Sequence, residues 1–174
     1  MAHISSGVEY GIHCLLFLID ESGCERGASV RDLAELQGVP VDFLAKIFTK
    51  LAKARLVVAT EGVKGGFSLA RSASEISVLD VVTAIDGKKA LFECREIRVR
   101  CAVFGDVAPA WATSGTCAVH SVMLSAQQLM EEALAKETLF DLADRVKRKS
   151  PASYGTKIIS WLDDRAALRN PKLG

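Results

Sequence analysis

The sequence predicts a mostly α-helical fold with a small β wing: a winged helix-turn-helix domain followed by a long C-terminal dimerisation helix. Three observations predict it. Two helical segments flank a tight turn at 37–40, two β-prone runs flank a glycine-rich loop, and a long apolar stripe begins after Cys117. The predicted regions are a DNA-binding domain (1–87), a cysteine-bearing sensor loop (88–117), a dimerisation helix region (118–147) and a C-terminal tail (148–174).

The helix-turn-helix occupies the first part of the chain. Residues 4–20 have the pattern of a largely buried helix. Ser29 and Asp32 then have the spacing of a capping box, with a hydroxyl at the N-cap and a carboxylate three residues later. The helix that they start is followed by the turn 37–40 and by a second helix over 41–54, which is the order of a helix-turn-helix.

The second of these helices has two faces. Its apolar residues follow i, i+3, i+4, i+7 from Leu44 and form the core side. Three lysines share the opposite side, where a solvated helix face is the plain alternative to a row of phosphate contacts. The preceding turn favours DNA, and the start of the helix would lie nearest the base edges. The predicted DNA-contacting residues of this helix are Val41, Asp42, Phe43, Lys46, Lys50 and Lys53.

A hairpin is predicted next. The β-prone runs 56–60 and 67–70 surround the glycine-rich loop 61–66, and a hairpin directly after a recognition helix is the wing of a winged helix. Lys64 would lie at its tip, where it would contact a phosphate or enter the minor groove.

A capping box at Ser77 and Asp80 predicts the start of one more helix. The second half of the chain begins after this helix. From 88 to 116 the periodicity is lost, which is uncommon in a compact domain unless the loop is functional or disordered. Apolar side chains in this stretch argue against plain disorder. We therefore expect a bound ligand to organise it.

A long helix is predicted from Cys117. Its apolar stripe is broad for the little chain left to cover it, which favours dimerisation over packing on its own domain. Beyond it we expect a short capped helix at 137–142, a linker at 147–151 and one further helix in the tail.

Composition and charge limit the function. The 174 residues are 49% hydrophobic with a net charge of +1, so any DNA-binding surface must be a local patch. No signal-peptide pattern opens the chain, and the longest apolar run, 12–19, is too short to span a bilayer. We therefore expect a cytoplasmic protein. The sequence contains neither a Gly-rich phosphate loop nor a Ser/His/Asp arrangement, so no motif indicates an enzyme.

The five cysteines do not suggest a disulfide framework, because the count is odd and a cytosol keeps thiols reduced. Cys14 lies in an apolar helix and is expected to be a core residue. Cys94, Cys101 and Cys117 are candidates for metal binding or redox chemistry.

Six runs carry a family resemblance: 4–14, 33–36, 43–46, 56–57, 65–67 and 78–87. Together they resemble the iron–sulfur transcription regulators of the IscR and NsrR type, which are dimeric winged-helix proteins of bacteria. The resemblance covers about residues 1–145 and keeps the order of the elements. The start of the chain and the run from Cys94 to Arg100 look closest to the redox-sensing RsrR branch.

The resemblance implies an iron–sulfur cluster, with [2Fe–2S] favoured over [4Fe–4S]. Its ligands would come from the loop before the long helix, at positions matching Cys94, Cys101 and Cys117. The fourth ligand is implied from one of two places. One is an acidic residue in the first helix of the partner subunit, matched by Glu9; the other is the histidine of a Cys-x-x-His run, matched by His120.

The residue chemistry is compatible with this, and it leaves alternatives open. Thiolates are the usual ligands of iron–sulfur clusters, and three arginines between Cys94 and Cys101 would lower thiol pKa values or only keep the loop soluble. The same three cysteines with His120 suit structural zinc, although no close Cys-x-x-Cys pair is present. A metal-free switch would join Cys94 and Cys101 in a disulfide.

The sequence therefore predicts a homodimeric DNA-binding transcriptional regulator that senses redox state, nitric oxide or iron–sulfur status. Two recognition helices related by a two-fold axis would bind a palindromic operator, one half-site each. A winged helix that binds protein is a further alternative, against which the lysines argue.

Overall fold

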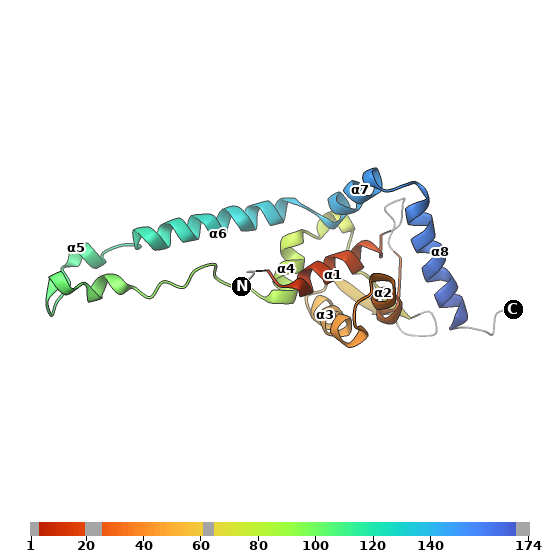
Figure 1. The fold of residues 1–174 in the computed structure, drawn as a ribbon, viewed down its shortest axis with the longest axis horizontal. Coiled ribbons are helices and arrows are strands. Elements are labelled where there is room, and N and C mark those ends of the chain that lie inside the picture. The colour runs from red at the N-terminus through yellow and green to blue at the C-terminus, as the bar shows by residue number, and fades with distance from the viewer. Residues whose placement is uncertain (1–3, 20–25, 61–64, 170–174) are drawn as a thin grey trace. The chain divides into compact units, whose positions relative to one another are not determined.

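The computed structural model describes residues 4–19, 26–60 and 65–169, and these form helices with one two-stranded sheet (Figure 1). The chain divides into two compact units. We call the described parts of Met1–Gly87 and Leu134–Gly174 the winged-helix unit, and Lys88–Ala133 the sensor unit. No helix in the described part of the chain is long and apolar enough to cross a bilayer.

The elements of the winged-helix unit follow the predicted order. They are α1 (Ser6–Leu16), α2 (Val30–Gln37), α3 (Val41–Lys53), β1 (Val57–Thr60), β2 (Gly66–Leu69), the 3-10 turn η1 (Ala73–Glu75), α4 (Val78–Asp86), α7 (Leu139–Lys149) and α8 (Ser153–Leu168). The sensor unit contains the 3-10 turns η2 (Ile97–Arg100) and η3 (Ala102–Phe104), the short helix α5 (Ala110–Thr113) and most of α6 (Ala118–Lys136).

The helix-turn-helix prediction is confirmed by α2, the turn and α3. α2 ends at Gln37 and is capped by Gly38, whose φ of 70° lies in the left-handed region that glycine enters without a steric penalty. The Val39 N–H then donates to the Ala34 carbonyl at 2.8 Å, which sets the angle at which the chain enters α3. α3 buries the predicted apolar stripe of Leu44, Ile47, Phe48 and Leu51.

The capping box predicted at the start of α2 forms only in part. The Ser29 hydroxyl accepts the Asp32 N–H at 3.1 Å, as expected. The Asp32 carboxylate does not bond the Ser29 backbone; it accepts hydrogen bonds from the Ser29 hydroxyl at 2.7 Å and from the Arg169 guanidinium. Asp32 is buried, so an arginine far along the chain supplies the counter-charge that burial demands.

The wing is confirmed as an antiparallel hairpin. β1 and β2 pair from Val57 with Leu69 to Thr60 with Gly66. Gly66 lies against the segment before α2, because a Cβ there would come within 2.5 Å of the Ala28 backbone. Lys64, the predicted tip residue, lies outside the described residues.

The residues directly after α6 are bonded to the start of α4. Ser77 and Thr138 each cap a helix through a complete capping box, and the two residues face each other in a β-bridge. The Val78 N–H donates to the Glu137 carbonyl at 2.8 Å, and the Leu139 side chain beside it is fully buried. The box predicted at Ser77 is therefore confirmed.

Two sequence-based boundaries are wrong. The first helix is shorter than 4–20, because the Ser5 N–H donates to Asp86 at 2.7 Å and α1 begins only at Ser6. The linker predicted at 147–151 is helical up to Lys149. Basic residues in a last helical turn interact favourably with the helix dipole, so the run that resembled a linker stabilises the end of α7.

The core of the winged-helix unit lies between α1, α3 and α4, and α7 packs against α1. Cys14 is completely buried there, as predicted. Burial raises the pKa of its thiol to about 12, which makes it unreactive at neutral pH.

Candidate sensor site and nucleic-acid interface

Cys117 immediately precedes α6, and its thiol lies at the N-terminus of that helix. The Cys117 carbonyl accepts the Ser121 N–H at 2.8 Å, and the sulfur accepts the backbone N–H groups of His120 and Val119. The first N–H groups of a helix have no partner within the helix, so a thiolate in this position satisfies them.

These contacts lower the pKa of Cys117. The largest cause is the N–H of His120, followed by the N–H of Val119; partial burial opposes them, and the positive charge of Arg98 adds to them. The reactive, metal-binding form of a cysteine is the thiolate. The contacts of Cys117 therefore favour its thiolate, which is the form that binds a metal or reacts.

Arg98 organises the loop around this thiol. Its guanidinium binds the Glu96 carboxylate through two nitrogens, with Nη2 at 2.8 Å from Oε2. The same Nη2 donates to the Gly115 carbonyl at 3.1 Å and lies 3.4 Å from that of Thr113. Arg98 thus connects η2 to the segment that leads into α6.

Arg98 also brings two of the predicted site residues into one electrostatic environment. The guanidinium interacts with the thiols of both Cys117 and Cys94, and these interactions help to raise its own pKa, for which the Glu96 bond is the largest cause. Of the three arginines in this stretch, Arg98 is the one whose charge acts on Cys117. Cys94 and Cys117 are both partly buried.

The remaining candidate ligands are Cys101, His120 and Glu9, and the last of these belongs to the winged-helix unit. Cys101 is exposed between η2 and η3. The His120 ring packs beside Phe92, with centroids 6.0 Å apart. Glu9 is exposed in the first turn of α1, in the winged-helix unit. Among the described side chains no three His, Cys, Asp or Glu residues converge as a preformed metal site.

The candidate DNA-binding face is the exposed side of α3. Val41, Asp42, Lys46 and Lys53 are exposed on it. Phe43 is also exposed, and its ring packs edge-on against Tyr10 with centroids 5.8 Å apart.

Lys50 differs from the other two lysines of this helix. Its amine donates to the Ile85 carbonyl at 2.6 Å and so caps the C-terminal end of α4. A phosphate contact by Lys50 would have to compete with this bond. Lys46 and Lys53 are consequently the better placed lysines of the predicted row.

Sequence reasoning missed three sets of contacts. They are the Arg98–Glu96 pair, the Lys50–Ile85 bond, and two ion pairs from α8 to α2, which join Arg165 to Glu35 and Arg169 to Asp32. The charges are visible in the sequence, but their partners depend on tertiary structure. By contrast, a capped helix was predicted at 137–142, and the cap is confirmed as a complete capping box of Thr138 and Asp141.

Comparison with known proteins gives a consistent result. Residues 4–145 match the family model Rrf2, described as an iron-dependent transcriptional regulator. A protein named rrf2 from Nitratidesulfovibrio vulgaris is 35% identical over 133 residues, which cover 76% of this chain and 81% of that protein.

Solved structures share the fold. The IscR of T. potens matches with a TM-score of 0.60 and 24% identity over 86% of this chain and 93% of that one. CymR, the global cysteine regulator of B. subtilis, matches with a TM-score of 0.63 and 21% identity over 83% of this chain and 98% of that one. The observed architecture is thus that of winged-helix regulators.

Proposed function

The chain belongs to the Rrf2 family of transcriptional regulators, and from that premise we propose that it is a homodimer that senses redox state, nitric oxide or iron–sulfur status through a bound iron–sulfur cluster. The family consists of DNA-binding regulators and not of enzymes. A regulator that acts on DNA in this way would work in the cytoplasm of a bacterial cell.

One observation carries the sensing part of the proposal. Cys117, whose pKa is lowered, lies at the head of α6 and shares the charge of Arg98 with Cys94. α6 continues without interruption to Lys136, and the residues directly after it bond to the start of α4. A change in what the thiols bind therefore acts at one end of a helix whose other end joins the winged-helix unit.

The donor set suits an iron–sulfur cluster in its chemistry. Cys94, Cys101 and Cys117 would hold it, with [2Fe–2S] as the favoured type, and a bound cluster would supply redox and nitric oxide chemistry. Arg98 interacts electrostatically with both Cys94 and Cys117, and its charge would offset that of a thiolate-bound centre. The exposed Cys101 and a fourth ligand, either His120 or Glu9 of the partner subunit, would complete the set.

The exposed apolar side of α6 supports a homodimer. No side chain of this helix is buried, and Val119, Val122 and Leu129 are between 58% and 67% exposed. A contiguous apolar stripe of this kind on a soluble protein usually marks an interface. A second copy of the same helix offers a matching apolar surface for a two-fold contact.

The exposed side of α3 supports DNA binding. In a dimer, two α3 helices would enter successive major grooves of a palindromic operator, and the side chains at the helix start would reach base edges. Lys46 and Lys53 would contact phosphates, as would Lys64 on the wing and, after release from Ile85, Lys50.

The proposal is tested by anaerobic purification followed by a visible absorption spectrum and iron, sulfide and zinc analysis. We expect iron and acid-labile sulfide in the wild type and their loss in Cys94→Ser, Cys101→Ser and Cys117→Ser. Cys14→Ala is the matched control and should keep the cluster, because Cys14 is a core residue. Zinc without sulfide would contradict the proposal and indicate a structural metal site.

A metal-free thiol switch is the second candidate, and the pair around Arg98 favours it. Two thiols and one peroxide molecule would give a disulfide and two waters, with the Cys117 thiolate as the attacking group. Cys94 is one candidate for the second member, because it also interacts with Arg98; the pair expected from the sequence is Cys94 with Cys101. Mass spectrometry of the peroxide-treated apo protein would identify the bonded pair, and an absence of iron and sulfide in the native protein would favour this candidate.

A further inference from the structure

Both chain connections between the sensor unit and the winged-helix unit meet α4. The chain enters the sensor unit at Lys88, directly after Gly87, which is the C-cap of α4. It returns at Leu134, and the residues after α6 then bond to the other end of α4, where the Val78 N–H donates to the Glu137 carbonyl at 2.8 Å. A change of order in the sensor unit would therefore act on both ends of one helix of nine residues.

α4 is packed closely against α1 and α3. A Cβ atom at Gly11 of α1 would lie 2.6 Å from the Cδ1 atom of Ile85 and 3.3 Å from the Cγ2 atom of Ile47 in α3, so a larger residue there would push Ile85 away. Ile85 and Ile47 are both buried. Asp86, the next residue of α4, accepts the N–H and the hydroxyl of Ser5 at 2.7 and 2.6 Å. Because close-packed interiors transmit strain, a shift of the last turn of α4 would reach both neighbouring helices.

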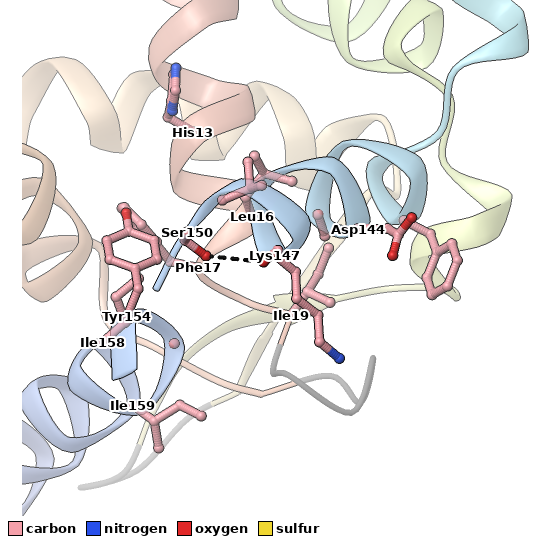
Figure 2. A pocket seen from close by; sticks show the side chains of 14 residues that line it. His13, Leu16, Phe17, Ile19, Asp144, Lys147, Ser150, Tyr154, Ile158 and Ile159 are labelled. Carbon is pink, nitrogen blue, oxygen red and sulfur yellow. Dashed lines mark hydrogen bonds between the residues drawn. The ribbon is translucent and has the colours of Figure 1, made fainter. Parts of the chain in front are cut away.

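α7, which also follows the sensor unit in the chain, is packed less completely. A pocket of about 310 Å³ lies between α1, α7 and α8, and Leu16, Phe140 and Ile158 are among the side chains that line it (Figure 2). A displacement of α7 can be taken up in this space, because a cavity has no atoms that resist the movement. α4 is therefore the better placed of the two helices to pass a change to α3.

One hydrogen bond joins the last turn of α4 to α3. The Lys50 amine of α3 donates to the Ile85 carbonyl at 2.6 Å. Carbonyls in the last turn of a helix have no N–H partner within it, and a positive charge there also interacts favourably with the helix dipole. Lys50 therefore stabilises the last turn of α4, after which the sensor unit begins.

The same amine belongs to the row of lysines proposed to contact DNA. It lies 2.6 Å from the Ile85 carbonyl, so a contact with a DNA phosphate would lengthen or break this bond. A state of the sensor unit that loosens the last turn of α4 would free Lys50 for DNA, and a state that orders this turn would retain it. By linkage, DNA binding and the state of the sensor unit would then influence each other by the same factor.

We propose that Lys50 is the positioning residue through which the sensor unit acts on DNA binding, because the last turn of α4 and a DNA phosphate compete for its amine. This inference rests on the proposed function and names the residue that carries its regulation. Lys50→Met tests it, since methionine is unbranched, has a helix propensity close to that of lysine and cannot donate to Ile85. Lys53→Met is the matched control, because it removes the same charge from the same row and both lysines are exposed.

The first experiment is amide hydrogen exchange, which needs neither DNA nor the cluster. In the apo protein, Lys50→Met should speed exchange in the last turn of α4 by about fivefold, the effect of losing one typical hydrogen bond. Lys53→Met should leave exchange there as in the wild type. No acceleration in Lys50→Met would mean that Lys50 does not hold this turn, and would overturn the inference.

The second experiment measures affinity for a duplex selected from a random library with the cluster-loaded protein, at one fixed salt concentration. Both variants should bind DNA more weakly than the wild type, because each has lost a positive charge. The affinities of the loaded and the apo protein should differ by at least about fivefold in the wild type and in Lys53→Met, and by less than about twofold in Lys50→Met. A merely structural role of Lys50 would lower both affinities alike and leave their ratio unchanged.

The outcomes separate this inference from the function on which it rests. A ratio that Lys50→Met keeps at the wild-type value, or that both variants lower equally, would overturn the inference and leave the sensing function in place. Equal affinities of the loaded and the apo wild type would overturn the sensing function, and the inference with it.

Discussion

The winged-helix unit and the sensor unit are stabilised by different means. The winged-helix unit has a core of buried apolar side chains, to which α1, α3 and α4 contribute. In the second, residues 88–133 are all described and none of them is buried. Its internal contacts include the Arg98 network, the edge-on pair of Phe104 and Trp111 at 5.8 Å, and the contact of Phe92 with His120.

This difference indicates which part of the molecule can change its conformation at a small cost in free energy. Segments with few buried apolar contacts open with small free energies, and regulatory elements are drawn from them. The residues proposed to contact DNA lie on the unit with the core, whereas Cys94, Cys101 and Cys117 lie on the unit without one. We therefore expect a ligand of these thiols to reorder the sensor unit without breaking the fold that carries α3.

The largest expected effect tests the core itself. Phe48→Ala should lower the free energy of unfolding by about 3–5 kcal/mol, because the fully buried ring leaves a cavity. Val103→Ala in the sensor unit should change it by less than about 0.5 kcal/mol, since that side chain is 83% exposed. Urea unfolding followed by circular dichroism measures both. Similar losses from the two variants would mean that the sensor unit shares the core.

The next effect tests the attachment between α6 and α4. Ser77→Ala and Thr138→Ala should each cost about 1 kcal/mol, because each removes an N-cap acceptor from a complete capping box. Ser125→Ala, on an exposed position of α6 where the hydroxyl bonds the Ser121 carbonyl, serves as the control. If Ser125→Ala lowered the free energy of unfolding as much as Ser77→Ala and Thr138→Ala do, α6 would be stabilised along its length and not at its end.

A third, smaller effect concerns DNA. Lys53→Ala should weaken binding to all duplexes alike and lower the slope of log affinity against log salt by about 0.9, the contribution of one phosphate contact. Lys50→Ala should change the slope less, because its amine already donates to Ile85. Fluorescence anisotropy over a salt series measures both slopes. A loss confined to one DNA sequence would indicate a base contact and contradict the phosphate role.

The smallest effect compares one thiol from each unit. Cys117 should be alkylated by iodoacetamide at a pH below the ordinary thiol pKa of about 8.5, because a lowered pKa populates the thiolate at lower pH. Cys14 should not react in the folded protein, since it is buried and its pKa is raised to about 12. Arg98→Gln should move the Cys117 profile to higher pH by removing a positive charge. An unchanged profile would contradict the claim that the charge of Arg98 lowers the pKa of Cys117.

Local signals in the sequence predicted most of the winged-helix unit. The glycine after α2, the box at Ser77 and the apolar spacing of α3 each act within a few residues, and all were recognisable before the fold was known. α7 was underestimated because its last basic turn resembles a solvated linker. The general order of elements therefore followed from the sequence.

The contacts that define the site were harder to predict, because they depend on side chains distant in the chain. Lys50 finds its acceptor 35 residues later, and Arg169 finds Asp32 across 137 residues. The position of Cys117 before α6 was predicted, but the pairing of Arg98 with Glu96, and the interaction of Arg98 with both Cys94 and Cys117, required coordinates. Periodicity specifies which face of a helix is apolar, and it does not specify which charge meets which partner.

The central claim is that the state of the thiols in the sensor unit controls DNA binding by the other unit. It is tested most directly by selecting a duplex from a random library with the cluster-loaded protein and measuring its affinity for the loaded and the apo protein at one fixed salt concentration. The account predicts affinities that differ by at least about fivefold, the lower end of typical allosteric coupling. Equal affinities would contradict it.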